Sequence, residues 1–330
     1  MLRVARHLLS DNDAQRHGQL RDYFCDKDAK ATPEDGAWRL ELDWPGGRER
    51  HVDPRIEAHL PALGVGDLSQ MALFRRSSGR MMTTLYDTWT LLAWSEWAKR
   101  SGARPGDRIT ILHLDDHRDL AAPRLATTAV GYEDLITGAA FDVLDPSSVK
   151  AACESGAVGM GSFLTPFLLR FPECDVRQLG QAPKITATTD SVFRAATVED
   201  DLLRPGVGRP AIALEPTSGG PGPGRYRATD HLGHWLSDIE DGPVLLHVDM
   251  DYFNNRYDGD GDWLDRRARH DPPIEMVLRR VDEVTAAIRE AGLLHRIGAG
   301  AVAFSPGFFP AEMWHPAEER LRAGLEELYG

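Results

Sequence analysis

The sequence predicts an α/β fold with a mainly parallel central sheet, and three observations support this prediction. Short β-type runs occur at residues 108–114, 184–188, 210–214, 243–249 and 297–304. Helical stretches lie between or after these runs, at residues 228–239, 273–291 and 311–328. Strands that alternate with helices are typical of a mostly parallel sheet covered on both faces. The chain has 330 residues, which is enough for one large domain of this class.

Three further segments carry local signals. Residues 37–52 predict a β-hairpin, because strand-forming residues flank a Pro-Gly-Gly turn. Residues 67–100 predict a helix that ends before Gly102, since apolar residues recur at helical spacing. The members of that stripe are Leu85, Trp89, Leu92 and Ala93. Residues 216–224 are rich in glycine and proline and predict a surface loop in preference to a domain boundary.

The composition narrows the class of protein. The net charge is −13, with 51 acidic against 38 basic residues, which disfavours nucleic-acid binding because that needs a concentrated basic face. No run of about 18 apolar residues occurs, and the N-terminus is too polar for a secretory signal, so no membrane association is expected. Cys25, Cys153 and Cys174 are odd in number and widely spaced, which favours reduced thiols and a cytoplasmic location. The oligomeric state stays open, a homo-oligomer included.

Two carboxylate-rich segments follow β-type runs that lie far apart in the chain. Residues 111–120 read Ile-Leu-His-Leu-Asp-Asp-His-Arg-Asp-Leu, and residues 244–253 read Val-Leu-Leu-His-Val-Asp-Met-Asp-Tyr-Phe. In an extended chain, alternate side chains share one face. These positions are Asp115, His117 and Asp119 in the first segment, and Asp249 and Asp251 in the second. Either segment alone would suit a solvated turn, but together their carboxylates would repel without a cation, which favours a dinuclear site for hard divalent ions.

The pattern Asp-x-His-x-Asp, followed far downstream by Asp-x-Asp, resembles the arginase/deacetylase superfamily, whose members bind two manganese ions with these motifs. The sequence is most similar to the arginase-like branch that includes peptide arginases of ribosomal-peptide pathways. Weaker similarities are Gly159-Met-Gly-Ser-Phe-Leu and Ala303-Phe-Ser-Pro-Gly-Phe-Phe-Pro. The resemblance spans residues 80–325, so residues 1–65 are expected to be an N-terminal addition, carrying the hairpin, to a single domain over residues 1–330.

The resemblance implies a three-layer α/β/α arginase-like fold and a hydrolase of guanidinium groups. Asp115 and Asp249 would bridge two Mn²⁺ ions, His117 and Asp251 would complete one ion site, and Asp119 would contribute to the other. These ligand types also tolerate iron or zinc. Hydroxide formed between the ions would attack the guanidinium carbon and release urea. The implied substrate is an arginine-containing peptide or a small guanidinium compound.

The sequence departs from the superfamily pattern in three places. No histidine precedes the first motif in the segment 85–94, and Asp87 is the candidate replacement for that ligand. Asp116 stands where arginases often have a small residue, so it is expected either to support a ligand or to face solvent. The usual Asp-Pro after the second motif is replaced by Phe253-Asn-Asn-Arg-Tyr. His113 and His247 precede the bridging candidates by two residues, and each is either a partner that orients a ligand or a core histidine.

Several roles stay open. The candidates for a proton shuttle are His231, His234, His270 and His315. The candidates for the acid that holds the guanidinium are Asp258, Asp260, Asp262 and Glu312. The segment 257–262 is expected to be an acidic loop at the mouth of the site that attracts a cationic substrate. Two other functions remain as alternatives: a deacetylase-like amidohydrolase with one metal ion, and a metal-stabilised binding protein without turnover.

Overall fold

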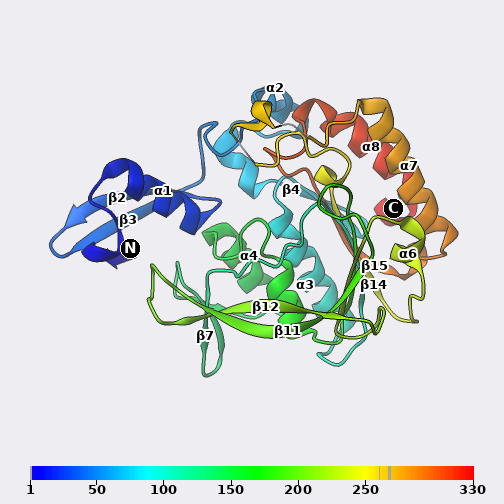
Figure 1. Cartoon of the computed structure of the whole chain (residues 1–330), viewed down its shortest axis with the longest axis horizontal. Coiled ribbons are helices and arrows are strands. Elements are labelled where there is room, and N and C mark those ends of the chain that lie inside the picture. Colours follow the sequence, from blue (N-terminus) through cyan, green and yellow to red (C-terminus); the bar gives the residue numbers. More distant parts are fainter. Residues whose placement is uncertain (1, 260, 267–268) are drawn as a thin grey trace.

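The computed structural model describes residues 2–259, 261–266 and 269–330. Within these residues, a nine-stranded sheet forms the centre of the molecule (Figure 1). Its order is β12 (Gly208–Thr217), β11 (Thr189–Glu199), β13 (Arg225–Thr229), β10 (Asp175–Leu179), β6 (Thr110–Leu114), β14 (Val244–Asp249), β15 (Ile297–Ala303), β5 (Met81–Thr84) and β4 (Arg75–Ser78). From β13 to β5 every neighbouring pair is parallel, whereas the pairs that involve β11 or β4 are antiparallel. The predicted α/β class with a mostly parallel central sheet is thus confirmed.

The strands at the centre of the sheet are fully enclosed. Every residue of β6 and of β14 is buried, and both strands read as nearly continuous apolar runs. Such runs are typical of parallel strands that are covered on both faces. The histidines within them, His113 and His247, are therefore polar groups deep in the protein.

Helices pack against this sheet and against one another. Their bounds are α2 (Ile56–His59), α3 (Thr90–Ser101), α4 (Pro146–Ser155), α5 (Leu164–Arg170), α6 (Leu232–Leu236), α7 (Ile274–Glu290), α8 (Trp314–Gly324) and α9 (Glu326–Tyr329). Helix α3 packs on β15, α6 packs on β10 and β13, and α7 packs on α8. The predicted helix at 273–291 is confirmed by α7, whose buried stripe is Val277, Val281, Val284 and Ile288. Among the described residues, no helix is both long and apolar enough to cross a bilayer.

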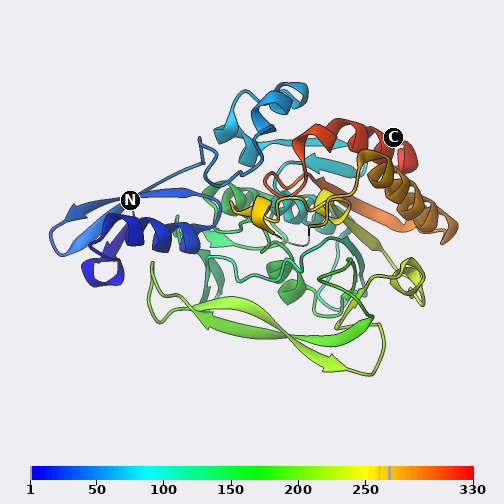
Figure 2. The ribbon, with the colours of Figure 1, turned by 45° about the horizontal axis from the view of Figure 1, so that its top comes forward.

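Residues 2–51, here called the N-terminal unit, lie to one side of the sheet (Figures 1 and 2). They contain β1 (Leu2–Ala5), α1 (Asp13–Phe24), β2 (Asp28–Glu34) and β3 (Ala37–Asp43), with the strands in a separate antiparallel sheet. The predicted hairpin at 37–52 is wrong in its partner strand, because β3 pairs with β2 across a turn at Asp35-Gly36 and with β1 on its other side. Gly36 has φ +68°, a conformation that glycine adopts without steric cost, so this turn prevails over Pro-Gly-Gly.

The predicted helix at 67–100 is wrong in its first half. Residues Leu68–Leu73 form a short 3₁₀ helix, and β4 and β5 follow it. The α-helix is only α3, with the 3₁₀ turn Asp87–Trp89 before it. The four residues of β5 are all buried and pair in parallel with β15, so tertiary pairing overrides the helical spacing. Asp87 consequently lies just beyond the carboxyl end of a strand, near the other candidate ligands.

Other segments differ less. The run expected at 184–188 precedes β11, and the helix expected at 228–239 is shortened to α6 by β13. The residues after Thr217 form the loop between β12 and β13, as expected for 216–224. A small antiparallel sheet of β7 (Leu125–Thr128), β8 (Gly131–Asp134) and β9 (Ala140–Phe141) lies beside β12.

Candidate metal centre

The two acidic motifs lie side by side at one edge of the central sheet. Strands β6 and β14 are parallel neighbours, with His113 opposite His247 and Leu114 opposite Val248. Both strands therefore deliver their following residues to the same edge, which in parallel sheets is the usual place of a binding site. The N–H of Asp116 donates to Oδ1 of Asp251 at 3.2 Å and joins the motifs directly.

The first motif converges by a turn and not by strand alternation. Strand β6 ends at Leu114, and Asp119 has φ +53°, so the chain is not extended over residues 115–119. Asp115 and Asp119 are nevertheless both buried at the centre. Nδ1 of His117 lies 2.9 Å from Oδ2 of Asp251 and 3.5 Å from Oδ1 of Asp115. The predicted convergence is present, although the predicted backbone conformation is not.

The second motif occupies the end of β14 and the 3₁₀ turn Met250–Tyr252 that follows it. Asp249 is the last residue of the strand, and its Oδ1 accepts the N–H of Asp251 at 3.1 Å. Its Oδ2 accepts a hydrogen bond from the hydroxyl of Ser305 at 2.5 Å. Because Ser305 follows β15, the neighbouring strand also supports this carboxylate.

The two strand histidines lie against the same carboxylates. Their rings stack with centroids 5.1 Å apart, and Nε2 of His247 lies 3.2 Å from Oδ2 of Asp115. The hydroxyl of Thr90 lies 2.9 Å from Nδ1 of His247 and so fixes the ring with Nε2 toward the centre. Burial lowers the pKa of His247 to about 3 and that of His113 well below its usual range. Both imidazoles are therefore neutral. Nε2 of His247 can act as a ligand, whereas Nε2 of His113 also donates to the carbonyl of His117 at 3.2 Å.

Among the described residues, donor atoms gather in two groups at this centre that share Asp115, and a third group, Asp116, His117 and Asp258, lies at the mouth. The first group comprises His113, Asp115, Asp119 and His247, and the second comprises Asp115, His117 and Asp251. Within each group, the donor atoms lie within 4.8 Å of one another. The sequence predicts Asp115 and Asp249 as bridging residues; Asp115 lies in both groups, whereas Asp249 lies in neither. For His113 and His247 it predicts a supporting or core role, and both lie in the first group. A histidine two residues before each bridging candidate was the available signal.

Asp87 faces this centre from the end of β5. Its Oδ2 accepts the N–H of Gly161 at 2.8 Å, and its Oδ1 has no hydrogen-bond partner among the described residues. Burial and the charge of Asp119 raise the pKa of Asp87 well above its usual range. Asp87 belongs to neither donor group, but it lines the same cavity as Asp119 and Asp249.

Negative charge exceeds positive charge at the centre. Burial, followed by the charge of Asp251, raises the pKa of Asp115 to about 7, and the same two causes raise the pKa of Asp249. Burial opposes the charged form of His117, but Asp251 and Asp115 outweigh it and raise the pKa of that imidazole. One imidazolium cannot neutralise this many carboxylates, and a bound divalent cation would.

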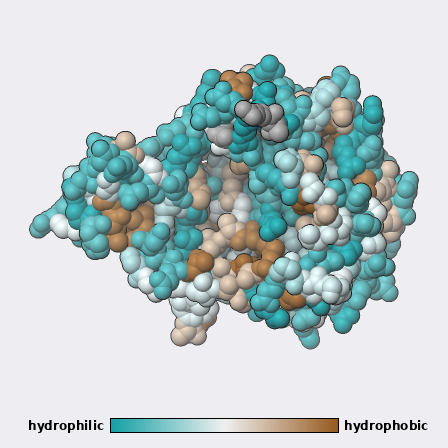
Figure 3. All heavy atoms as spheres, viewed as in Figure 1, coloured by the Kyte–Doolittle hydropathy of each residue, from teal (hydrophilic) through white to brown (hydrophobic). Residues whose placement is uncertain are grey.

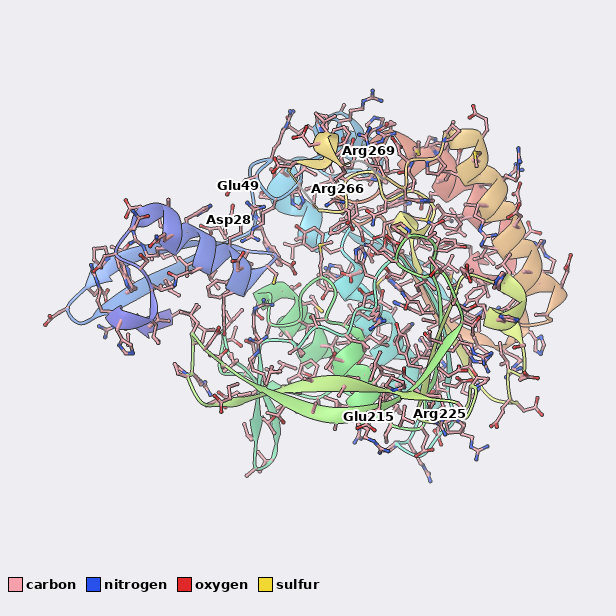
Figure 4. The ribbon with its side chains drawn as sticks, viewed as in Figure 1. Asp28, Glu49, Glu215, Arg225, Arg266 and Arg269 are labelled. Atoms are coloured by element: carbon pink, nitrogen blue, oxygen red, sulfur yellow. The ribbon has the colours of Figure 1, made fainter. Side chains whose placement is uncertain are left out.

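The mouth of the site has a different charge balance. Nζ of Lys184 lies 3.0 Å from Oδ2 of Asp116 and 2.7 Å from Oδ1 of Asp258. Nδ2 of Asn255 donates to both carboxylates, at 2.7 and 3.0 Å. Arg266, labelled in Figure 4, lies 2.8 Å from the other oxygen of Asp258. Asp116 is thus buried among these partners, and does not face solvent.

The candidate acids for holding a guanidinium are largely engaged. Burial opposes the charged form of Asp258, but His117 and Lys184 outweigh it and lower its pKa. Glu312 pairs with Arg256 at 2.6 Å and with Arg55 at 3.2 Å. Asp260 lies outside the described residues. The expected acidic loop at the mouth is therefore neutralised at Asp258.

The candidate shuttle histidines do not line the cavity. His234 contacts Thr188, His231 lies beside Asp230, and His315 is exposed on α8 beside Glu319. His270 lies near Gln181 and the carbonyl of Phe253. The spacing of these four histidines in the sequence does not choose among them, and none of them lines the cavity.

A cavity of about 400 Å³ opens onto the carboxylates. Its other walls include Leu120, Ala121, Met160 and Phe308, and the ring of Phe308 meets that of His117 edge-on at 5.3 Å. Met160 and Phe308 also border a neighbouring chamber of about 260 Å³. They come from the two segments with weak similarity to the arginase-like branch. Figure 3 shows apolar atoms in a hollow between the N-terminal unit and the rest of the molecule.

No protein-family model matches the sequence of the chain, and no curated protein matches it either. The geometry and charge of this centre are therefore the features that indicate a function.

Proposed function

We propose that this protein is a metal-dependent hydrolase that uses two divalent ions at the ends of β6 and β14. The observation that carries the proposal is the group of buried carboxylates, Asp87, Asp115, Asp119 and Asp249, beside two neutral imidazoles. Burying carboxylates without compensating charge is costly, and the pKa of each of the four is raised accordingly. A set of carboxylate and imidazole donors with unpaired oxygens fits divalent metal ions.

The donor groups suggest how two ions would be held. His113, His247, Asp119 and Asp115 would hold one ion, and His117, Asp251 and Asp115 would hold the other. Asp249 would serve both ions, as the resemblance implies, and Asp87 would contribute a further oxygen from the cavity wall. Manganese is the proposed metal, with iron or zinc as substitutes that the same ligands tolerate. When bound, such ions supply Lewis acidity and lower the pKa of water.

The proposed reaction is hydrolysis of a guanidinium group with release of urea, on peptidyl arginine or a small guanidinium compound. The apolar side chains of Leu120, Met160 and Phe308 would pack along the aliphatic part of an arginine. Similarity in the two acidic motifs extends the proposal to an arginase-like three-layer fold.

Two alternatives each have a supporting observation. The first alternative is a deacetylase-like amidohydrolase with one ion, which the missing upstream histidine favours. Asp87 would have to replace that histidine as a ligand, but one of its oxygens already accepts a backbone hydrogen bond. The distance of the candidate shuttle histidines from the cavity favours a metal-stabilised binding protein. Release of acetate or ammonia would support the first alternative, and metal binding without turnover would support the second.

The proposal is tested by incubating the manganese-loaded protein with an arginine-containing peptide and measuring urea. We expect urea and an ornithine residue in the product. The control is Asp249→Asn, which keeps the size of the side chain and its contact with Ser305 but removes the charge. Absence of urea from every guanidinium compound tried, with manganese bound, would contradict the proposed reaction.

A further inference from the structure

The N-terminal unit contacts a glycine-rich turn beside the metal centre through one buried acid. Asp26 is 6% exposed, and its Oδ2 accepts the N–H of Met160 at 2.7 Å. A Cβ added at Gly159 would collide with that same carboxylate oxygen. Glycine at this position therefore allows the close approach of Asp26.

The same turn holds a carboxylate of the centre on its other side. The N–H of Gly161 donates to Oδ2 of Asp87 at 2.8 Å, two residues after Gly159. The turn is closed by Ser162, whose hydroxyl lies 2.9 Å from the nitrogen of Gly159 and 2.7 Å from its carbonyl oxygen. A displacement at Met160 would thus move the group that orients Asp87.

A second contact ties the N-terminal unit to the segment that follows the first motif. Nε of Arg124 donates to the carbonyl of Tyr23 at 2.5 Å, and Nη2 of Arg124 lies 2.8 Å from Sγ of Cys25. The N–H of Arg124 donates to the carbonyl of Ala157 at 2.7 Å, at the start of the glycine-rich segment. Residues 23–26 therefore pack against both chain segments that flank the centre.

We propose that Asp26 is a positioning residue of the metal centre, which it serves by fixing the 159–162 turn that orients Asp87. The N-terminal unit, for which the resemblance provides no counterpart, would then be part of the working site. This inference rests on the proposed function, because it requires ions at the centre. It makes the affinity for metal depend on a side chain that touches none of the proposed ligands.

The test measures manganese affinity and stoichiometry by titration for Asp26→Ala, Asp26→Asn and a matched control. The control is Asp28→Ala, two residues away and labelled in Figure 4, whose carboxylate pairs with Arg50 at 3.0 Å. We expect Asp26→Ala to lower the affinity for one ion by about tenfold or more. Losses of this size follow when residues that orient the ligands are removed from other metal sites. Asp26→Asn should keep most of the affinity, because its amide oxygen can accept the same N–H. Asp28→Ala should bind as the wild type does.

A second variant approaches the same turn from its other side. Gly159→Ala places a methyl group against the Asp26 carboxylate and should lower the affinity for the same ion. This variant decides the question if Asp26→Ala does not fold. Wild-type affinity in the variants of Asp26 and Gly159 that fold would overturn the inference and leave the proposed function intact. A wild-type protein that binds no manganese would overturn both.

Discussion

Two acidic clusters adjoin each other in this molecule, since Asp115 belongs to one and Asp116 to the other. They differ in which side chains balance their negative charge. The inner cluster at the ends of β6 and β14 has carboxylates beside neutral imidazoles, and the pKa of Asp115 and of Asp249 is raised. The outer cluster at the mouth has Asp116 and Asp258 beside Lys184, and the pKa of Asp258 is lowered.

The difference between the clusters shows that a group of acidic side chains does not by itself indicate a metal site. Asp116, His117 and Asp258 also gather donor atoms within 4.8 Å, as the inner groups do. Lysine and arginine side chains already neutralise the outer cluster, so an ion there would displace existing partners. Arg118 also lines the cavity of the inner cluster, but the ion pairs that Asp115 and Asp119 make among the described residues are with histidines. Charge balance, more than the number of acids, indicates where a cation binds.

The largest expected effect comes from removing one acid in each cluster. Asp249→Asn should weaken manganese binding by about a hundredfold or more, because it removes a charge from the inner cluster. Asp258 has a left-handed backbone conformation, which asparagine tolerates. Asp258→Asn should weaken binding by about tenfold at most, because Asp258 contacts only the far nitrogen of the ligand His117. Metal titration of both variants tests the contrast. Equal losses in the two would remove the distinction between the clusters.

Metal removal should make stability depend on pH. In the metal-free protein the raised pKa of Asp115, about 7, means that the folded state keeps a proton that the unfolded chain releases above about pH 4. Stability of the metal-free protein should therefore fall as pH rises from about 4 to 7. Manganese replaces that proton, so it should raise Tm more at about pH 8 than at about pH 5.5. Scanning calorimetry would show this; an increase that is the same at both pH values would count against a charge-driven site.

A smaller effect is expected at Asp87, which lines the cavity and accepts a hydrogen bond from the glycine-rich turn. Asp87→Asn keeps an acceptor for the N–H of Gly161 and removes the charge. We expect the affinity for one of the two ions to fall by about tenfold. At limiting manganese, the variant should then bind one equivalent fewer than the wild type. Unchanged metal content would remove Asp87 from the ligands.

The smallest effect is expected at the outer cluster. Lys184→Met leaves Asp116 and Asp258 with fewer cationic partners, but the lysine is partly exposed and the pairs are screened by solvent. We expect a loss of about 1 kcal/mol in the free energy of unfolding, measured in denaturant. Manganese affinity should change by less than in Asp87→Asn, although Lys184 also contacts the outer nitrogen of His117. A collapse of metal binding would show that the two clusters act as one.

The sequence predicts the parts of this molecule that depend on local pattern. Buried parallel strands read as apolar runs, so β6 and β14 and the acids that follow them were found. Strand β5 was missed because its pairing with β15 is tertiary, and Asp87 was therefore placed on a helix. The pairing of Lys184 with Asp258 joins two loops far apart in the chain, and no local pattern encodes it. The same is true of the contact between Asp26 and Met160.

The central claim is that the inner cluster holds two cations. The most direct measurement is metal analysis of the purified protein after exposure to excess manganese and removal of unbound ions. We predict two equivalents per chain, lost together in Asp249→Asn and retained in Asp258→Asn. A wild-type chain that retains no manganese would contradict the account.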